Sequence, residues 1–304
     1  MTCCPEGWLT EKSDNKRGVY SKTRLEAAID SGEILESRAY MCDNDHNLLV
    51  NLGSMKGIIP RTEGALGIKE GETRDIALIS RVGKAVCFTV KEIVNEGGRE
   101  YALLSRCEAG RIAKEKLLRE KTVGDIIDAR VTHLESFGAF CDIGCGNIAL
   151  LPIDSISVSR ISHPRDRFSV GDDIKVIIRN IENGRITLSH KELLGTWEEN
   201  AELFTQGQTV FGVVRSVENY GIFVELAPNL AGLAESRDNV RVGMSASVYI
   251  KSIIPEKMKI KLIIIDTFDA EPPKEIKYFY SGDRIDEFIY SPLCSNKKIV
   301  TNFL

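Results

Sequence analysis

Two pairs of aromatic side chains occur at the same spacing in two places, and each pair has a glycine directly after its first member. Phe137 and Phe140 form one pair, and Tyr220 and Phe223 form the other. Aromatic rings on a protein surface stack on nucleobases, and each stacked base contributes about 1–3 kcal/mol. In a regular strand, residues three apart point to opposite faces. We expect the glycine to permit a bulge that returns both rings to one face, and its missing Cβ to leave room for a ligand.

Basic residues follow where a last strand would present them beside the rings. Arg185 comes directly after an Asn-Gly turn, and Lys259 aligns with it in the second copy of the pattern. Lys257, Lys259 and Lys261 alternate with apolar residues, so a period of two places all three on one face. Such a stripe would contact phosphates, and binding would weaken with salt. Two alternatives stay open: the lysines form a solvated edge that discourages aggregation, and the rings fill the interior of the fold.

The rings belong to a unit that the chain contains twice. The offset from Gly124 to Gly207 is 83 residues, and the same offset relates Phe140 to Phe223. A pattern that recurs at a fixed offset indicates one folded unit that has been copied. A third, worn copy begins near Gly32, but Asp-His-Asn-Leu at 45–48 replaces its aromatic element. We expect the worn copy to keep the fold and to lack the stacking surface.

Each good copy contains five short segments that are rich in β-forming residues. In the first good copy these segments are 126–134, 139–143, 147–151, 174–181 and 185–190. The last two flank Asn183-Gly184, which is a strong hairpin signal. Five strands in about 70 residues, without a long helix, predict a small closed barrel. Beyond Pro272-Pro273 the apolar residues alternate again, at 276–280 and 285–290, and 298–304 could form another strand, so we expect a small β tail.

Composition and charge narrow the class of protein. Hydrophobic residues make up 43% and charged residues 28% of the chain, which is ordinary for a globular protein. The net charge of -4 argues against a protein that holds duplex DNA by charge alone. The longest apolar runs, such as 262–265, are too short to cross a bilayer, and the N-terminus lacks the pattern of a secretory signal. We therefore expect a cytoplasmic protein with no membrane partner.

Catalytic and metal sites find little support in the sequence. The four histidines, at 46, 133, 163 and 190, have no metal-ligand spacing, and no Gly-x-x-x-x-Gly-Lys-[Ser/Thr] loop is present. Cys141 and Cys145 lack a second pair to complete a zinc site, so we expect the eight cysteines to be reduced and several of them to be buried. We expect no enzyme activity, no metal and no cofactor.

These elements together resemble the RNA-binding domain family first described in the multi-repeat ribosomal protein S-one, a subclass of the OB-fold. The matching residues of the first good copy are Gly124, Phe137, Gly138, Ala139, Phe140, Leu150, Val170-Gly171-Asp172 and Leu188-Ser189. Those of the second are Gly207, Gly212, Val214, Tyr220, Gly221, Phe223, Gly232-Leu233 and Val242-Gly243. The family often has a histidine where this chain has Pro152 and Glu235. With the worn copy, the resemblance covers about residues 25 to 265.

The resemblance implies an all-β protein of three tandem five-stranded OB-fold barrels, joined by short helical linkers and followed by a small β C-terminal tail. We expect seven segments along the chain. They are an N-terminal extension (1–24), a degenerate barrel (25–106), a helical linker (107–121), an RNA-binding barrel (122–191), a helical linker (192–205), a second RNA-binding barrel (206–266) and the tail (267–304).

The resemblance also implies a bacterial cytoplasmic protein that binds single-stranded RNA in translation, bringing mRNA to the small ribosomal subunit. The residues expected to bind RNA are Phe137, Phe140, Arg185, Tyr220, Phe223, Lys257, Lys259 and Lys261. Two other functions stay open. One is a regulator of RNA stability or gene expression that never joins the ribosome. The other is a protein-interaction scaffold whose barrels have lost RNA binding.

Overall fold

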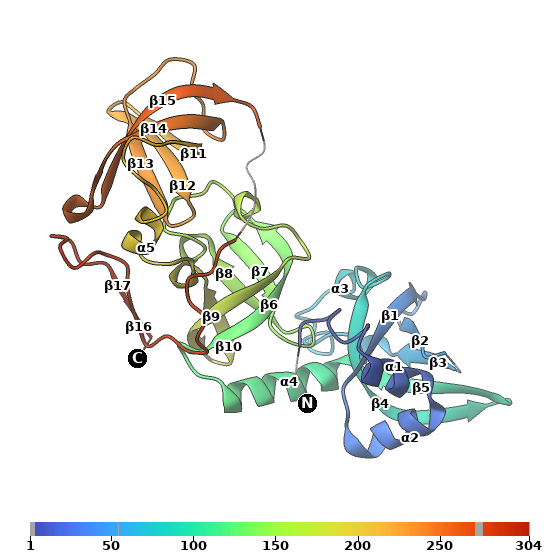
Figure 1. The fold of residues 1–304 in the computed structure, drawn as a ribbon. Coiled ribbons are helices and arrows are strands. Elements are labelled where there is room, and N and C mark those ends of the chain that lie inside the picture. The colour runs from blue at the N-terminus through green and yellow to red at the C-terminus, as the bar shows by residue number, and fades with distance from the viewer. Residues whose placement is uncertain (1–3, 54, 271–275, 304) are drawn as a thin grey trace. The chain divides into compact units, whose positions relative to one another are not determined.

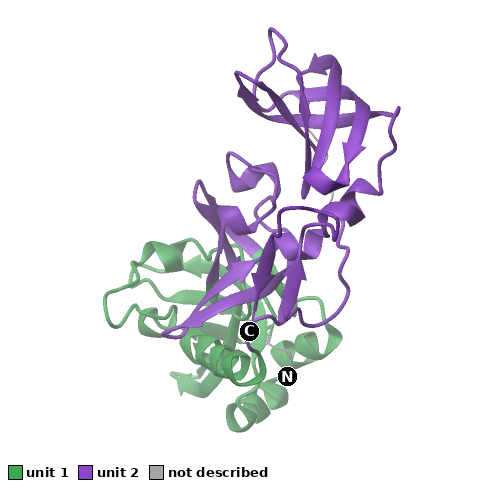
Figure 2. Cartoon of the chain, turned by 90° about the vertical axis from the view of Figure 1, so that its left-hand side faces the viewer, with its two compact units in different colours: residues 1–121, 128–130, 142–148 green, residues 122–127, 131–141, 149–304 purple. Residues whose placement is uncertain are grey.

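The structure is a computed structural model that describes residues 4–53, 55–270 and 276–303 (Figure 1). It contains two compact units (Figure 2). Unit 1 comprises residues 1–121, 128–130 and 142–148, and unit 2 comprises residues 122–127, 131–141 and 149–304. Pro272 and Pro273, where the tail is predicted to begin, lie outside the described residues. No helix within these described ranges combines the length and apolar character needed to span a membrane.

Unit 1 contains a closed five-stranded barrel with helices before and after it. Its helices are α1 Ser13–Tyr20, α2 Lys22–Ser31, α3 Ile76–Ile79 and α4 Arg106–Glu120, and its strands are β1 Leu35–Cys42, β2 Leu48–Asn51, β3 Lys56–Ile59, β4 Ala85–Glu96 and β5 Arg99–Ser105. The strand order is β1-β2-β3-β5-β4, with β3 parallel to β5 and the other neighbours antiparallel. Leu48, Phe88 and Leu104 are fully buried in its core.

The N-terminal segment of unit 1 is bound to this barrel through one buried carboxylate. Glu36, on β1, is 1% exposed and accepts hydrogen bonds from the backbone N–H groups of Gly7, Leu9 and Thr10. Asn15 donates its side-chain amide to the carbonyl of Glu36 and accepts from its N–H, both at 2.8 Å. Because a buried carboxylate needs such donors, the segment preceding α1 is an integral part of the first barrel.

Two further closed barrels follow. The strands of the second are β6 Ile126–Glu135, β7 Gly138–Asp142, β8 Ile148–Pro152, β9 Asp173–Glu182 and β10 Arg185–Ser189, and those of the third are β11 Thr209–Glu218, β12 Gly221–Ala227, β13 Leu230–Ala234, β14 Ser245–Ile254 and β15 Lys259–Phe268. Their orders are β10-β8-β7-β6-β9 and β11-β12-β13-β15-β14. Around each closed barrel, starting from its own first strand, the order is first, second, third, fifth, fourth. All three barrels share this order, which agrees with copies of one unit. The predicted all-β fold of tandem five-stranded barrels is confirmed.

The linker predicted to be helical over 192–205 is two short helical pieces. A 3₁₀ helix covers Lys191–Leu194, and α5 covers Trp197–Ala201. Gly195 lies between them at φ 85° and ψ 162°, a positive-φ conformation that favours glycine and ends the first piece. A Cβ at Gly195 would lie 2.7 Å from the ring of Phe279, so the tail also requires glycine here.

The C-terminal tail binds to the barrels of unit 2 instead of forming a separate sheet along its whole length. Among the described residues after β15, only β16 Glu287–Ile289 and β17 Val300–Asn302 pair as strands, and the strand predicted over 276–280 is wrong. Polar groups of that segment form hydrogen bonds to the linker and to the second barrel. The Phe279 N–H donates to the carbonyl of Leu193 in the linker, and the Tyr278 hydroxyl accepts from the Lys175 N–H of β9 at 3.0 Å. Ile285 and Phe303 are buried beside Ile126 of β6.

A buried asparagine connects the second barrel, the linker, the third barrel and the tail within unit 2. Asn229 precedes β13 and is 0% exposed. Its side-chain oxygen accepts from the Val158 N–H at 2.9 Å, and its amide donates to the carbonyls of Lys191 and Gly195 at 2.7 and 2.8 Å. Its own carbonyl accepts from the Tyr290 hydroxyl at 2.6 Å. All four hydrogen bonds would be lost if these segments separated.

A buried ion pair lies in the same unit. Glu225, on β12, and Arg167, from the loop before β9, are both almost fully buried and form a charge-assisted hydrogen bond. Arg215, on β11, binds both oxygens of Glu225, at 3.0 and 3.1 Å. A carboxylate held by two guanidinium groups is stable only when both remain in place, since removal of one partner leaves a buried charge.

His190 is the buried titratable group at the end of the second barrel. It is 0% exposed, and its Nδ1 lies 2.9 Å from the carbonyl of Ile156, so Nδ1 carries the hydrogen. Burial lowers the pKa of His190 to about 4; the bond to Ile156 opposes this shift and the charge of Arg167 adds to it. The ring packs edge-on against Phe168 and Tyr278. The imidazole is therefore neutral in the folded protein.

We expect unit 2 to lose stability as the pH falls below about 6.5. The unfolded chain protonates a histidine near pH 6.5, whereas folded His190 resists protonation down to about 4. Proton binding therefore favours the unfolded state in this window, by about 1.4 kcal/mol per pH unit and roughly 2 kcal/mol by pH 5. Urea unfolding followed by the fluorescence of buried Trp197, in a Trp8→Phe background, measures it. A His190→Asn variant should show a shallower dependence, and an identical slope would contradict the assignment.

Candidate nucleic-acid interface

The two aromatic pairs have the same geometry in the second and third barrels. Phe137 and Tyr220 are 54% and 71% exposed, and their partners Phe140 and Phe223 are half-buried. The ring centroids are 5.9 Å apart at an interplanar angle of 89° in the first pair, and 6.2 Å apart at 87° in the second. Each barrel of unit 2 thus presents two nearly perpendicular rings to solvent.

The second ring of each pair lies outside its barrel, because the strand alternates. Ile222 and Val224 are 0% exposed and belong to the core of the third barrel, whereas Phe223 between them does not. In β7, Ala139 and Cys141 are likewise fully buried on either side of Phe140. The alternative that these rings fill the interior therefore fails.

In the third barrel, the bulge predicted at the glycine is absent. In the third barrel the pairing of β11 with β12 is continuous through Glu218↔Gly221, Val217↔Ile222 and Ser216↔Phe223, and the irregularity lies earlier in β11, between Val214 and Ser216. The first ring reaches the outer face because it precedes the strand: Phe137 and Tyr220 are both in turns. A residue in a turn is not bound by strand alternation, so no bulge is needed.

The glycines are required by a close approach of the neighbouring strand. A Cβ at Gly138 would lie 2.5 Å from the carbonyl oxygen of Leu151, and a Cβ at Gly221 would lie 2.5 Å from that of Ala234. Gly221 also has φ 149°, which disfavours other residues. The space that the missing Cβ leaves is therefore taken by backbone of the same barrel, and not by a ligand as predicted.

Lys261 lies on the same face as the rings of the third barrel. Phe223 pairs with Leu233, and Leu233 pairs with Lys261, so the three side chains form one row across β12, β13 and β15. Neighbouring strands are about 4.8 Å apart, which puts the Lys261 backbone about 10 Å from that of Phe223. Lys259 is two residues earlier on the same face of β15, and both lysines are exposed. If the bases of a nucleic-acid strand stacked on the rings, the phosphates of that strand would pass within reach of these ammonium groups.

Lys257 does not belong to this stripe. It ends the 3₁₀ helix Pro255–Lys257, and Met258 follows in the left-handed region at φ 47°. The turn breaks the period of two on which the prediction depended. Lys257 instead lines a cavity of 300 Å³ together with residues of the tail, including Tyr290 and Lys297.

Arg185 occupies the position predicted for it, at the start of β10, and is exposed. It lies directly opposite Glu182 of β9. A carboxylate opposite an arginine across a strand pair reduces the positive potential there. The second barrel therefore presents its rings with a weaker cationic neighbour than the third barrel does.

His133 is an additional ring on the second barrel that the sequence analysis did not single out. It is exposed on β6 and stacks on Phe140, with centroids 6.3 Å apart and planes inclined by 30°. The repeat contained a signal for this position. The 83-residue offset aligns His133 with Ser216, and Ser216 pairs directly with Phe223 in the third barrel, so His133 is expected beside Phe140. Phe137, Phe140 and His133 together form a three-ring surface.

The described residues of the first barrel that align with the ring pairs do not form such a surface. Leu48, which aligns with Phe140 in the repeat, is 0% exposed and belongs to the core of unit 1. The turn before it is closed by Asp43, whose carboxylate accepts from the N–H groups of Asp45 and Asn47 at 3.0 and 2.8 Å. His46 takes φ 62° in this turn. Within the described part of the chain, no group of three or more His, Cys, Asp or Glu side chains is placed to hold a metal ion.

Comparison with known proteins identifies the class of domain. Residues 120–191, which span the second barrel, match the family model of the S1 RNA binding domain. The predicted resemblance to the S-one type RNA-binding domain family is therefore confirmed, and the second barrel is such a domain.

Curated relatives extend the match to the other barrels. A protein from Staphylococcus aureus (strain COL) named "Small ribosomal subunit protein bS1" is 32% identical over 238 residues, which cover 72% of this chain and 58% of the relative. A protein of the same name from Staphylococcus haemolyticus (strain JCSC1435) is 28% identical over 306 residues, which cover 90% of this chain and 76% of the relative. The chain thus spans 58% of the length of the first of these relatives.

A solved structure from Streptococcus pneumoniae, described as a multidomain protein with nucleic acid binding domains, aligns with 77% of this chain and 73% of its own. Its sequence identity is 15% and its TM-score 0.25, too low to bear on the arrangement of this chain.

We expect Gly221→Ala to destabilise unit 2 by about 2–4 kcal/mol, because the added Cβ meets the Ala234 carbonyl and the backbone is strained. Gly243→Ala is the matched control: Gly243 also has positive φ, at 91°, but a Cβ there meets nothing within 4 Å. It should cost only about 1–2 kcal/mol, the backbone strain alone. Urea unfolding followed by Trp197 fluorescence compares the two, and equal losses would show that the close approach is unimportant.

Proposed function

We propose that unit 2 binds single-stranded RNA on the outer faces of the second and third barrels. Phe137 and Phe140 stack bases on one barrel, and Tyr220 and Phe223 stack them on the other. The observation that carries the proposal is the repeated geometry: two solvent-exposed ring pairs at 5.9 and 6.2 Å, both nearly perpendicular, in two barrels of one protein. The match of residues 120–191 to the S1 RNA binding domain supports it.

Phosphate contacts come from the last strand of each barrel. Lys261 and Lys259 lie beside the rings of the third barrel, and Arg185 lies at the same position in the second. Because stacking tolerates most bases and lysines contact only the backbone, this surface holds unpaired RNA with little base preference. The proposal assigns the chain no catalytic step.

We expect the third barrel to contribute more to the affinity for RNA than the second barrel does. It combines a more exposed ring, Tyr220 at 71%, with two lysines on the same face. The second barrel compensates with a third ring, His133. The buried contacts of Asn229 and Glu225 keep both barrels in one folded unit, so both surfaces are presented by one chain at high local concentration.

The setting that the relatives favour is translation in the cytoplasm. The curated relatives are named as small ribosomal subunit proteins, and we propose that this chain presents mRNA to the small ribosomal subunit.

We expect Tyr220→Ala with Phe223→Ala to weaken binding of a labelled single-stranded RNA by about tenfold to a hundredfold, since one or two stacked bases are lost. Fluorescence anisotropy at low salt measures the affinity. The matched control is Phe211→Ala with Phe268→Ala. These rings are also exposed, at 42% and 40%, and their centroids are 6.1 Å apart, but both residues lie within strands and not in the turn before β12. An equal loss in both double variants, or none in the first, would contradict the assignment of the site.

We expect Lys259→Met with Lys261→Met to make binding less sensitive to salt. Each phosphate contact to a single strand contributes about 0.7 to the slope of log affinity against log salt, so the slope should fall by about 1.4. Lys297→Met with Lys298→Met, on the tail, removes the same charge from exposed positions outside the strand. If the two double variants change the slope equally, net charge and not the β15 stripe determines the effect.

The ribosomal setting has its own test. The purified chain, mixed with small subunits and mRNA, should sediment with the subunits, and the Tyr220→Ala, Phe223→Ala variant should sediment with them less. A chain that binds RNA in the anisotropy assay but stays in the light fractions would instead be an RNA-binding regulator outside the ribosome.

A further inference from the structure

Unit 1 contains a cavity away from the ring surfaces, which we call the Arg81 cavity. Its volume is 310 Å³, and all its lining residues belong to unit 1. They come from the loops around α3, from the first half of α4 and from the turn between β7 and β8. The charged side chains in the lining are Arg81, Arg106 and Lys114, and no carboxylate is among the lining residues.

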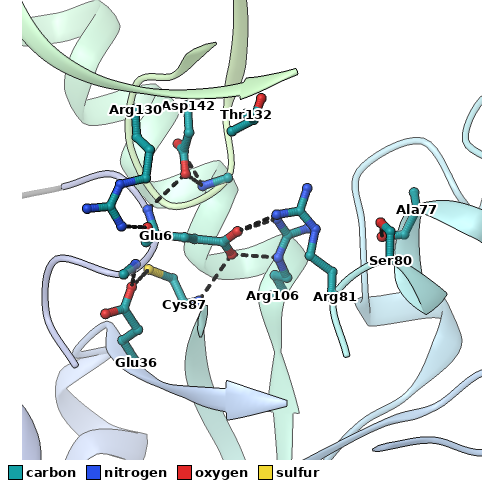
Figure 3. A network of polar contacts seen from close by, with 12 residues as sticks. Glu6, Glu36, Ala77, Ser80, Arg81, Cys87, Arg106, Arg130, Thr132 and Asp142 are labelled. Atoms are coloured by element: carbon teal, nitrogen blue, oxygen red, sulfur yellow. Dashed lines mark hydrogen bonds and ion pairs between the residues drawn. The ribbon is translucent and has the colours of Figure 1, made fainter. Parts of the chain in front are cut away.

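One carboxylate, outside the cavity lining, forms ion pairs with both arginines. Glu6 is buried, and its two oxygens accept from Arg106 Nε and Nη2 at 2.7 and 2.9 Å (Figure 3). Arg81 Nη1 donates to the same carboxylate at 3.0 Å. The ion pair with Arg106 and the charge of Arg81 outweigh the effect of burial and lower the pKa of Glu6. Two guanidinium groups therefore share a single firmly ionised carboxylate.

The second nearby carboxylate, Asp142, is bound mainly by backbone groups. Asp142 accepts from the backbone N–H groups of Glu6, Gly144 and Gly146, at 2.8, 2.8 and 3.0 Å, and makes no ion pair among those that the described residues show. Burial, with the repulsion of Glu6, raises the pKa of Asp142 to about 6. Its oxygens are bound by backbone N–H groups and not by the guanidinium groups of Arg81 or Arg106.

Arg81 is left under-compensated. Its side chain is 21% exposed, and its Nε is buried without a hydrogen-bond partner among the described residues. Burial, together with the charge of Arg106, lowers the pKa of Arg81, and the charges of Glu6 and Asp142 only partly offset this shift. A buried donor without a partner costs about 1–3 kcal/mol, so Arg81 is less well satisfied than Arg106, whose Nε and Nη2 both donate to Glu6.

Lys114 adds a third positive charge at the cavity. It is half-buried on α4 and lies in the lining, and no ion pair involving it is found in the part of the chain that is described. Leu66 and Ile148 form an apolar part of the lining and are 48% and 46% exposed. The cavity therefore combines a cationic side with an apolar side that is open to solvent.

We propose that the Arg81 cavity binds a small molecule that carries a phosphate group, held by Arg81, Arg106 and Lys114. Arginine and lysine are the side chains that bind phosphate oxygens best. The volume of 310 Å³ equals that of roughly ten water molecules and leaves room beyond a bare phosphate. The apolar side formed by Leu66 and Ile148 suits a base or sugar, so a nucleoside monophosphate is the ligand class that fits best. This site is independent of RNA binding by the rings.

Isothermal titration calorimetry of the full chain at constant ionic strength tests the proposal, with inorganic phosphate, adenosine 5′-monophosphate and adenosine as probes. We expect the monophosphate to bind, inorganic phosphate to compete with it, and adenosine to bind at least tenfold more weakly. The adenosine arm separates capture of the phosphate from stacking on the exposed rings of unit 2. Equal binding of adenosine and the monophosphate, or no binding of the monophosphate, would overturn the proposal.

Lys114→Met should weaken binding of the monophosphate by about tenfold or more, because one charged contact is lost. Lys114→Arg, which keeps the charge, should bind within about threefold of the unaltered chain. Lys116→Met removes the same charge from the same helix but outside the lining and should leave the affinity unchanged. Circular dichroism verifies that each variant folds. An affinity that is unaffected by Lys114→Met in a folded chain would contradict the assignment.

Discussion

In the second and third barrels, two strands approach closely where β7 or β12 begins, and the ring surface depends on this approach. The carbonyl of Leu151 or Ala234 occupies the place where a Cβ of Gly138 or Gly221 would be. The preceding residue is thereby held in a tight turn and its ring projects into solvent. The next outward position along the strand carries the second ring. One steric constraint therefore sets both members of the pair, and its repetition explains why two barrels present the same geometry.

The buried polar contacts connect different segments in the two units. In unit 2, Asn229 and Glu225 connect two ring-bearing barrels and the tail through buried hydrogen bonds and ion pairs. In unit 1, Glu6 and Glu36 bind the N-terminal segment to a barrel whose aligned position carries Leu48 in place of the second ring. The first barrel has exchanged the stacking element for a turn closed by Asp43. What unit 1 offers to a ligand is instead the cationic cavity around Arg81.

The local features were predictable from the sequence, and the non-local ones were not. The Asn183-Gly184 hairpin and the alternation of apolar residues gave the strands of the second barrel to within a residue or two. The ring positions followed from the repeat, although the reason for the glycine did not, since the carbonyl it accommodates comes from another strand. Lys257 was misplaced because a left-handed Met258 cannot be inferred from a period of two. The bonds of Glu6 to Arg106 and of Tyr278 to Lys175 join residues about 100 positions apart and leave no local signal.

The most direct test of the central claim is to identify which side chains touch bound RNA. Ultraviolet crosslinking of the chain to a uridine-rich single strand, followed by mass spectrometry of the peptides, reports this contact without altering the protein. The account expects crosslinks at Phe137, Phe140, Tyr220 or Phe223. Crosslinks confined to the other exposed rings of the third barrel, Phe211 and Phe268, would contradict it.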